Sequence, residues 1–453
     1  MGFALAAGAL GRAEAESLAA SRDDVAMLLA RRIEAQHRGT GGLVSLVRAR
    51  DAWTVRHGTL SRESHQQVLL DTPFQIASLT KIFTALLLAD AVQRGELRLD
   101  DTLTSHFPGP VPSFDGRAIT LLDLVTHTSG LPLRPPSRVD RSQDNPYAGY
   151  AHDDLRADIA ATVLSRAPGA AFEYSNFGFG LLGAALSERL GRAYADILQE
   201  RILTPLRMRA TTLAPSCAMQ SRFIQGYDME FAPAHVWDFG ALAPAGGLFS
   251  TARDLRKFIA LWSGADDRPL THAARSMFAP RRSGPDPTTQ MALGWRVIER
   301  GGRTLGWSNG SGGGVRSYMA VAPGDEGVIA YANMQTGIGV DDIGLHVLDP
   351  ASPVDVTPIP LRVEISVPPE VLDRYVGHYA YAPGDELTIV RDGERVALVY
   401  GPNRFRLYAE TPTLFFMRED NVTFEFQTAD GGAASSLVQT QAGETFTYRR
   451  VMP

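Results

Sequence analysis

The spacing of hydrophobic positions changes several times along this chain, and each change predicts a different element. Residues 21–36 carry apolar side chains at helical spacing, whereas 42–47 and 52–58 have the pattern of two paired strands. The almost continuous apolar run at 82–92 predicts a buried helix. From about 97 to 213 the pattern is mainly helical, with proline-rich breaks. The first half of the chain is therefore expected to be mostly helical beside a strand hairpin.

Extended segments replace this pattern further along. Residues 291–297, 315–322 and 327–333 are rich in strand-forming side chains, and the glycine-rich segment 305–314 is expected to be a turn that leads into an edge strand. With the hairpin, these strands predict one antiparallel sheet that carries the terminal helices, with the helical region as an insertion. This arrangement belongs to the α+β class.

Prolines at 350, 353, 358 and 360 mark an extended linker. Short alternating runs follow it at regular spacing and predict a small β-barrel or sandwich. The runs lie at 386–391, 395–400, 405–409, 413–417, 422–427, 435–440 and 445–450.

The length of 453 residues exceeds what one core usually supports, so we predict two domains. The boundaries that we expect are 21–347 for the first domain, 348–362 for the linker and 363–453 for the second. Two roles fit the second domain equally: a structural buttress, or a wall or lid of a substrate cleft. Residues 1–20 are either a truncated export signal or the first turns of a helix, because an apolar run and a small-x-small pattern are present but a charged start is missing.

Composition narrows the function. The net charge of −6 argues against general nucleic-acid binding, which needs a basic face. The sequence shows neither a membrane-spanning run nor the Cys/His spacing of a zinc site, and no cofactor is predicted. Cys217 is the only cysteine, so an internal disulfide is impossible, and without a nearby histidine its thiol is expected to be buried or idle.

The first candidate catalytic motif is Ser78-Leu79-Thr80-Lys81, at the start of the apolar helix. Residues three apart share a helix face, so the Lys81 amine should lie beside the Ser78 hydroxyl. A serine is a weak nucleophile until a base takes its proton, and a buried lysine can be shifted toward neutrality and do so. Alone, the pattern is weak, because an N-cap serine with an exposed lysine would look the same.

Further segments of the chain strengthen the catalytic interpretation of Ser78 and Lys81. Tyr174-Ser175-Asn176 lies on a loop between a Pro-Gly turn and an apolar helix, where a phenol and an amide can reach a shared cleft. Residues 121–132 and 305–321 complete the set. With these motifs in this order, the chain resembles the serine β-lactamase and penicillin-binding-protein superfamily from about residue 44 to about 335. It is most similar to the class C β-lactamase branch, with its D-alanyl-D-alanine carboxypeptidases, D-aminopeptidases and family VIII esterases.

The resemblance implies a β-lactamase/transpeptidase-like sheet flanked by helices with an all-helical lobe, and a lipocalin-like C-terminal barrel. It implies Ser78 as nucleophile and Lys81 as proton acceptor or relay. Tyr174 is expected to be the general base, alone or through a proton shared with Lys81, and Asn176 to hold Lys81 or the substrate amide. The backbone N–H groups of Ser78 and Ser311 would form the oxyanion hole.

The third motif departs from the family. Relatives carry Lys-Thr-Gly or His-x-Gly where this chain has Ser308-Asn309-Gly310, so the cation is missing. Trp307 is an alternative working residue, as in some family VIII esterases. Arg316 is either a substitute cation or a solvated strand residue. The missing charge favours neutral esters or amides over the substrates of β-lactamases and carboxypeptidases.

Three other sequence patterns are not interpreted as catalytic or cofactor sites. We interpret His127 as a hydrogen-bonded packing residue and not as the partner of a Ser–His triad. The Gly-x-Ser-x-Gly match around Ser308 lacks a following helix, because Gly312 to Gly314 oppose one. The Gly-x-Gly-x-x-Gly match at 178–183 is expected to allow close helix packing, since it lacks the context of a dinucleotide site.

We therefore predict a serine acyl hydrolase that uses a Ser-Lys-Tyr acyl-enzyme on D-amino-acid-containing peptides or amides, or on small esters. The alternatives are a β-lactamase, an acyltransferase or peptide cyclase, and a non-catalytic penicillin- or peptidoglycan-binding protein. The expected partner is a small-molecule or peptide substrate, with neither nucleic acid nor an integral membrane segment. Because such relatives work on cell-wall material, a periplasmic or secreted location is expected over a cytoplasmic one.

Overall fold

The computed structural model describes residues 20–36, 39–48, 52–139, 144–228, 231–263, 267–334, 339–358, 360–382, 384–401, 403–418, 421–428, 431–441 and 443–451. The hypothesis about residues 1–20 therefore concerns a segment outside the described residues, Ala20 excepted. The chain divides into two compact units, with the boundary between Val356 and Thr357.

An eight-stranded sheet organises the first unit, in the order β2-β1-β12-β11-β10-β9-β8-β7, and its described strand pairs are antiparallel. The strands are β1 (Gly41–Arg48), β2 (Trp53–Gly58), β7 (Arg282–Ser283), β8 (Gln290–Met291), β9 (Arg296–Arg300), β10 (Arg303–Gly312), β11 (Val315–Ala322) and β12 (Glu326–Ala332). The α+β prediction is confirmed.

Three details of the predicted sheet are wrong. The strand at 315–322 lies inside the sheet between β10 and β12 and is not an edge strand, and residues 305–312 belong to β10 and not to the turn. The strand expected at 291–297 is broken into β8 and β9, because Gly294 has a φ of +74° that a regular strand does not allow.

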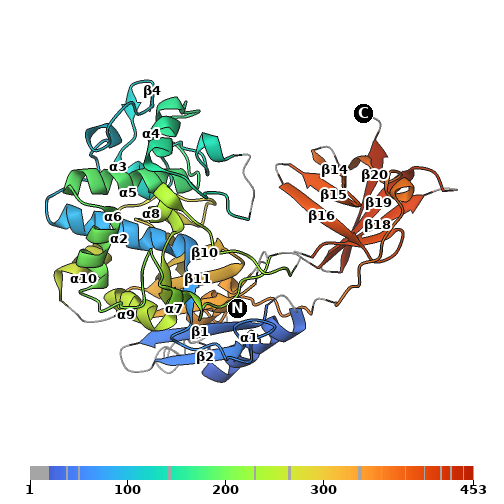
Figure 1. The fold of residues 1–453 in the computed structure, drawn as a ribbon, viewed down its shortest axis with the longest axis horizontal. Helices are drawn as coiled ribbons and strands as arrows, with labels where there is room; N and C mark the ends of the chain where they lie inside the picture. Colours follow the sequence, from blue (N-terminus) through green and yellow to red (C-terminus); the bar gives the residue numbers. More distant parts are fainter. Residues whose placement is uncertain are drawn as a thin grey trace, which may run out of the picture. The chain divides into compact units, whose positions relative to one another are not determined.

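Helices cover both faces of this sheet. Side chains alternate along β11, so that Tyr318 and Ala320 pack with α1 (Arg22–Gln36) and α11 (Asp341–Leu348), while Met319 and Val321 face α2 (Thr80–Gln93) and α9 (Ala252–Ser263). Because both faces are covered, β11 and β12 are apolar almost throughout. Figure 1 shows α1 on one side of the sheet and the stacked helices α2, α5 and α8 on the other.

The helical lobe holds short elements around two long apolar helices, α2 and α5 (Asn176–Leu190). Gly180 and Gly183 of α5 face Leu242 and Pro244, where an added Cβ would lie 2.3 Å from Leu242 Cδ2 and 2.1 Å from Pro244 Cγ. These glycines therefore allow close packing, which confirms that interpretation of the motif at 178–183. The remaining elements of the unit are α3 (Leu121–Val125), α4 (His152–Ala161), α6 (Tyr194–Leu198), α7 (Cys217–Gln220), α8 (Ala243–Gly246), α10 (Pro269–Ser276), β3 (Pro73–Gln75), β4 (Ser113–Phe114), β5 (Arg117–Ala118) and β6 (Phe249–Thr251).

The second unit is a closed barrel of β13 to β20. Its elements are α12 (Pro369–Leu372), β13 (Gly377–Ala382), β14 (Asp385–Asp392), β15 (Arg395–Tyr400), β16 (Asn403–Ala409), β17 (Leu414–Phe416), β18 (Val422–Thr428), β19 (Ala434–Gln441) and β20 (Glu444–Val451). The sequence pattern missed β13, which pairs with both β14 and β20 and so removes the open edges of the sheet. Aromatic and aliphatic side chains pack in its core, among them Tyr375 stacked on Phe426 at 4.2 Å.

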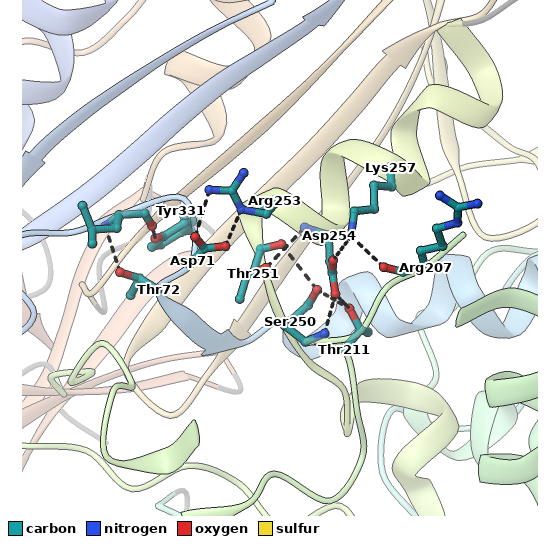
Figure 2. A network of polar contacts seen from close by, with 12 residues as sticks. Asp71, Thr72, Arg207, Thr211, Ser250, Thr251, Arg253, Asp254, Lys257 and Tyr331 are labelled. Carbon is teal, nitrogen blue, oxygen red and sulfur yellow. Dashed lines mark hydrogen bonds and ion pairs between the residues drawn. The ribbon is translucent and has the colours of Figure 1, made fainter. Parts of the chain in front are cut away.

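A polar network anchors the two short strands β3 and β6, which precede the Ser78 turn and α9 respectively (Figure 2). Asp254, at the start of α9, is buried and accepts hydrogen bonds from Ala210 N at 2.7 Å, Thr211 Oγ1 at 3.2 Å and Lys257 Nζ at 2.6 Å. Three donors on one carboxylate satisfy a charge that burial would otherwise make costly.

Replacing Asp254 with asparagine is expected to lower the free energy of unfolding by about 3 kcal/mol, because a buried amide cannot accept from all three donors. Asp71 is the matched control, since it pairs with Arg253 on the exposed side of the same network (Figure 2). Asp71→Asn should cost no more than about 1 kcal/mol. Urea denaturation of both variants measures the difference, and equal losses would contradict this account of Asp254.

Candidate active site

Ser78 lies in a strained turn between β3 and α2. The hydrogen-bonded strand β3 ends at Gln75, and Ala77 then adopts a φ of +46°, a left-handed conformation that costs a non-glycine residue about 1–2 kcal/mol. A single 3-10 turn, Ala77–Leu79, leads into α2. The turn leaves Ser78 half-buried while Leu79 and Thr80 are fully buried, so the hydroxyl stands at the helix start.

Lys81 is buried one turn further on, and its amine contacts the Ser78 hydroxyl. Its Nζ lies 3.1 Å from Ser78 Oγ, 2.7 Å from Asn176 Oδ1 and 2.7 Å from the carbonyl oxygen of Ala245. Burial lowers the pKa of Lys81 well below its ordinary value, and the positive charge of Arg296 lowers it further. The alternative of an exposed lysine beside an N-cap serine is therefore wrong.

Tyr174 reaches the same hydroxyl from the other side. Its phenol lies close enough to the Ser78 hydroxyl for that group to affect the Tyr174 pKa, and Lys81 Nζ lies 4.7 Å from the centre of its ring. Burial raises the pKa of Tyr174, although the nearby Ser78 hydroxyl and the charge of Arg296 oppose this shift. The structure thus brings Ser78, Lys81 and Tyr174 together from separate segments of the chain.

The loop that carries Tyr174 is held by its neighbour Ser175 and by His127. Ser175 caps α5 by accepting from Gly178 N at 2.8 Å, and its backbone N–H donates to His127 Nδ1 at 3.0 Å. Since Nδ1 accepts, His127 is neutral with its proton on Nε2, and burial lowers its pKa well below the ordinary value. Its ring packs against Tyr174 at 4.4 Å. His127 is therefore a hydrogen-bonded packing residue, as predicted.

Asn176 links Lys81 to a residue that sequence reasoning missed. Its Oδ1 accepts from Lys81 Nζ and its Nδ2 donates to Tyr147 Oη at 2.8 Å, so both halves of the amide are used. Tyr147 is fully buried and comes from the loop at 138–152. The only sequence signal was the presence of two tyrosines, Tyr147 and Tyr150, in a largely polar loop.

The third motif lies along β10, which passes directly against the Ser78 turn. A Cβ on Gly310 would lie 2.4 Å from the Ile76 carbonyl oxygen and 3.3 Å from Ser78 N, so only glycine permits this approach. Ser308 is buried, whereas Trp307, Asn309 and Ser311 alternate with it and are half-buried. A partnership of Ser78 and Ser311 as oxyanion donors stays a prediction.

Arg296 supplies the cation that the third motif lacks. It lies on β9 directly opposite Trp307 of β10, and its guanidinium carbon is 4.8 Å from the Trp307 ring and 5.6 Å from the Tyr174 ring. Its charge acts on the pKa values of both Lys81 and Tyr174. The third motif itself carries no cation, as predicted from the sequence, and a positive charge reaches the site from the neighbouring strand.

Arg316 and Asn309 both interact with Asp341 at the start of α11. Arg316, opposite Ser311 on β11, is half-buried, and its charge lowers the pKa of Asp341 at the start of α11. Asn309 Nδ2 donates to Asp341 Oδ2 at 2.5 Å. Arg316 is thus not simply a solvated strand residue.

Lysine usage carries a signal that the motifs alone do not show. The chain contains only two lysines, Lys81 and Lys257, among 44 basic residues. Arginine cannot be deprotonated in a protein, whereas lysine can. In a chain that uses arginine almost everywhere, a lysine inside Ser-x-x-Lys stands out as a place where a neutral amine is needed.

Within the described residues, no three His, Cys, Asp or Glu side chains gather as a metal site requires. In the same part of the chain, helices both long enough and apolar enough to cross a bilayer are absent.

The fold and the arrangement of Ser78, Lys81 and Tyr174 are those of a serine hydrolase with a Ser-x-x-Lys motif. Comparison with family models agrees: a model described as Beta-lactamase matches residues 28–345, and a Domain of unknown function (DUF3471) matches 361–451. The chain belongs to the beta-lactamase family of serine hydrolases, whose homologues include D-Ala-D-Ala carboxypeptidases, penicillin-binding proteins and class C β-lactamases.

Individual relatives are moderately similar. The chain is 30% identical over 270 residues to the D-alanyl-D-alanine-carboxypeptidase/endopeptidase AmpH of Escherichia coli K12. The aligned region covers 56% of this chain and 69% of AmpH. The crystal structure of a class C beta lactamase from Rhodobacter sphaeroides superposes with a TM-score of 0.62 at 25% identity, covering 72% of this chain and 98% of that one. The octameric penicillin-binding protein homologue from Pyrococcus abyssi shares the fold over 95% of this chain and 100% of its own, with a TM-score of 0.61 at 19% identity.

Proposed function

We propose that this protein is a serine acyl hydrolase that forms an acyl-enzyme on Ser78 and acts on D-amino-acid-containing peptides and amides or on small esters. The observation that carries the proposal is the contact of a buried lysine amine with a serine hydroxyl, 3.1 Å apart, with the Tyr174 phenol near the same hydroxyl. A nucleophile and a base within hydrogen-bond reach are what acyl transfer requires.

The two pKa directions support a division of labour. Burial favours the neutral amine of Lys81 and the protonated phenol of Tyr174. Lys81 would take the Ser78 proton as Oγ bonds to the acyl carbon, and Tyr174 would pass its proton to the leaving group as the bond of that group to the carbon breaks. The proton on Lys81 would then move to the Tyr174 phenolate, so both groups return to their starting forms. Water would then cleave the acyl-enzyme and restore the hydroxyl. Backbone N–H groups of Ser78 and Ser311 would hold the oxyanion.

Arg296 bears on the substrate. A guanidinium beside Tyr174 and Trp307 suits an acyl donor with a carboxylate near the scissile bond, because arginine binds carboxylates through paired hydrogen bonds. Peptides that end in a D-amino acid have such a carboxylate, and AmpH is named as a carboxypeptidase for peptides of this kind. With this charge beside Tyr174, neutral substrates are not favoured over those that carry a carboxylate.

The test is the mass of the protein after incubation with a fluorescent penicillin or a p-nitrophenyl ester. We expect an acyl adduct on Ser78 that is lost with time, as the ester is turned over. Ser78→Ala should abolish the adduct, whereas Ser308→Ala should retain it, because Ser308 is buried in β10. No adduct from either probe would contradict the proposal and favour the non-catalytic binding protein.

A further inference from the structure

A chain of polar contacts runs from the N-terminus of α11 to the candidate active site. The Asn309 amide lies in its middle, with Nδ2 donating to Asp341 Oδ2 at 2.5 Å and Oδ1 accepting from Arg296 Nη1 at 3.5 Å. The partly positive NH₂ group of the amide faces the Asp341 carboxylate, and the partly negative oxygen faces the Arg296 guanidinium. Arg296 then faces the Tyr174 ring at 5.6 Å, so the contacts connect Asp341 to the group beside Ser78.

Asp341 is an unusual residue to find at the start of this chain of contacts. Its Oδ1 is closed off from solvent and has no hydrogen-bond partner among the described residues. A buried carboxylate oxygen without a donor is costly, and such costs are typical of groups retained for function. Asn309 satisfies Oδ2 only, so the local fold gains little from this carboxylate.

The groups that surround Asp341 come from every element packed against it. Arg296 of β9 and Arg316 of β11 bring positive charge, whereas Asp342 of α11 brings negative charge and itself pairs with Arg32. Tyr318 of β11 faces the carboxylate with a buried hydroxyl. Burial, opposed by the Asn309 hydrogen bond and the arginines, raises the pKa of Asp341 to about 6.

We propose that Asp341 is a positioning residue for the acyl-transfer reaction, which holds the Arg296 guanidinium against Tyr174 through the amide of Asn309. The proposal rests on the proposed function, since it assigns Asp341 to the same site. Arg296 holds down the pKa values of Lys81 and Tyr174 only while it stays beside them. Loss of the acceptor on Asp341 should therefore change the ionisation of the site as well as its rate.

The experiment compares Asp341→Leu, which removes the acceptor, with Asp341→Asn, which keeps an acceptor and removes the charge. We expect Asp341→Leu to lower kcat/KM for a p-nitrophenyl ester by about 10- to 100-fold, as displacement of a positioning group does. In the pH profile of kcat/KM, the acid limb of Asp341→Leu should move to higher pH. The reason is that Lys81 loses the nearby positive charge that lowers its pKa. Asp341→Asn should keep kcat/KM within about 5-fold of the wild type at neutral pH, since a retained acceptor still orients Asn309.

A purely structural role would lower the melting temperature of Asp341→Leu but leave its pH profile in place, and that result overturns the proposal. A loss in Asp341→Asn as large as in Asp341→Leu overturns it too. Asn309→Ala removes the bridging amide without touching Asp341 and must shift the acid limb in the same direction. Asp325→Asn, an exposed carboxylate on the same unit, is the control and should not shift it.

The wild-type adduct on Ser78 separates the two proposals. If it fails to form, the proposed function is wrong. If it forms at a normal rate and the acid limb of Asp341→Leu stays unmoved, only the role of Asp341 is wrong.

Discussion

Replacing Lys81 with arginine is expected to lower kcat/KM for the acylation of Ser78 by about 10³-fold, whereas the same replacement at Lys257 should leave it within about 2-fold. A guanidinium keeps its proton at any accessible pH, so the arginine variant would have no lone pair for the serine proton. Lys257 only donates to Asp254 and to the carbonyl of Arg207, and arginine can do the same. The two lysines of the chain therefore form a matched pair.

Lys81→Met separates lost chemistry from lost structure, because methionine is closer in volume to lysine than arginine is. It should be as inactive as Lys81→Arg in acylation of Ser78, measured as the rate of adduct formation by mass spectrometry. A variant with methionine that still acylates at more than a tenth of the wild-type rate would contradict the role of Lys81 as base.

The same variant has a stability signature with a definite sign. In the unfolded chain Lys81 binds a proton up to its ordinary pKa of 10.5, but in the folded protein only up to a much lower pKa. Between the two values unfolding takes up a proton, so the wild type loses stability as the pH falls through that window. Methionine cannot take up a proton. The free energy of unfolding of Lys81→Met, relative to wild type, should therefore rise as the pH falls, in urea titrations at a series of pH values.

Replacing Tyr174 with phenylalanine is expected to lower kcat/KM by about 10²- to 10³-fold, the usual contribution of a positioned proton donor or acceptor. The phenol lies near the Ser78 hydroxyl, and burial raises its pKa, so it should stay protonated through neutral pH. Wild-type activity should then fall only as the pH rises through this raised pKa, and the fall should be absent from the variant.

This pH dependence distinguishes the proton-donor role that we propose for Tyr174 from the general-base role that the family resemblance implies. If the phenolate were the base, wild-type activity would rise with pH through the pKa of Tyr174. Tyr194→Phe is the control, because it removes another buried phenol that bonds Thr84 Oγ1 at 2.7 Å, one turn of α2 after Lys81. Stopped-flow rates with a p-nitrophenyl ester across the alkaline range decide between the two roles.

Much of the fold could be predicted from local pattern. The apolar run at 82–92 became α2, and the alternating runs after the prolines became strands of the barrel. Such elements are set by side-chain spacing, which the sequence displays directly. β13 was missed because its Tyr/Ala alternation is only partly apolar, and its strand conformation depends on pairing with β14 and β20.

The residues of the candidate site also fall into two groups, those that a local sequence pattern predicts and those that only the tertiary structure brings together. Ser78 and Lys81 lie one helical turn apart, so their contact is local and a motif predicts it. Arg296 and Tyr147 reach the site through strand register and loop packing, which bring together residues far apart in sequence. The sequence offered Arg316 as one of two alternatives and did not point to Arg296, because the pairing of β9 with β10 is not visible in either segment alone.

By itself, the sequence determined the family, the order of elements and the one-turn spacing of the serine and the lysine, because each depends on side chains close together in the chain. Tertiary structure decided the rest. It closed water away from Lys81, which is what lowers its pKa, and it brought Tyr174 and the Arg296 charge to the serine. Burial and long-range charge depend on distances in space, and those are settled only when the sheet and the helical lobe pack together.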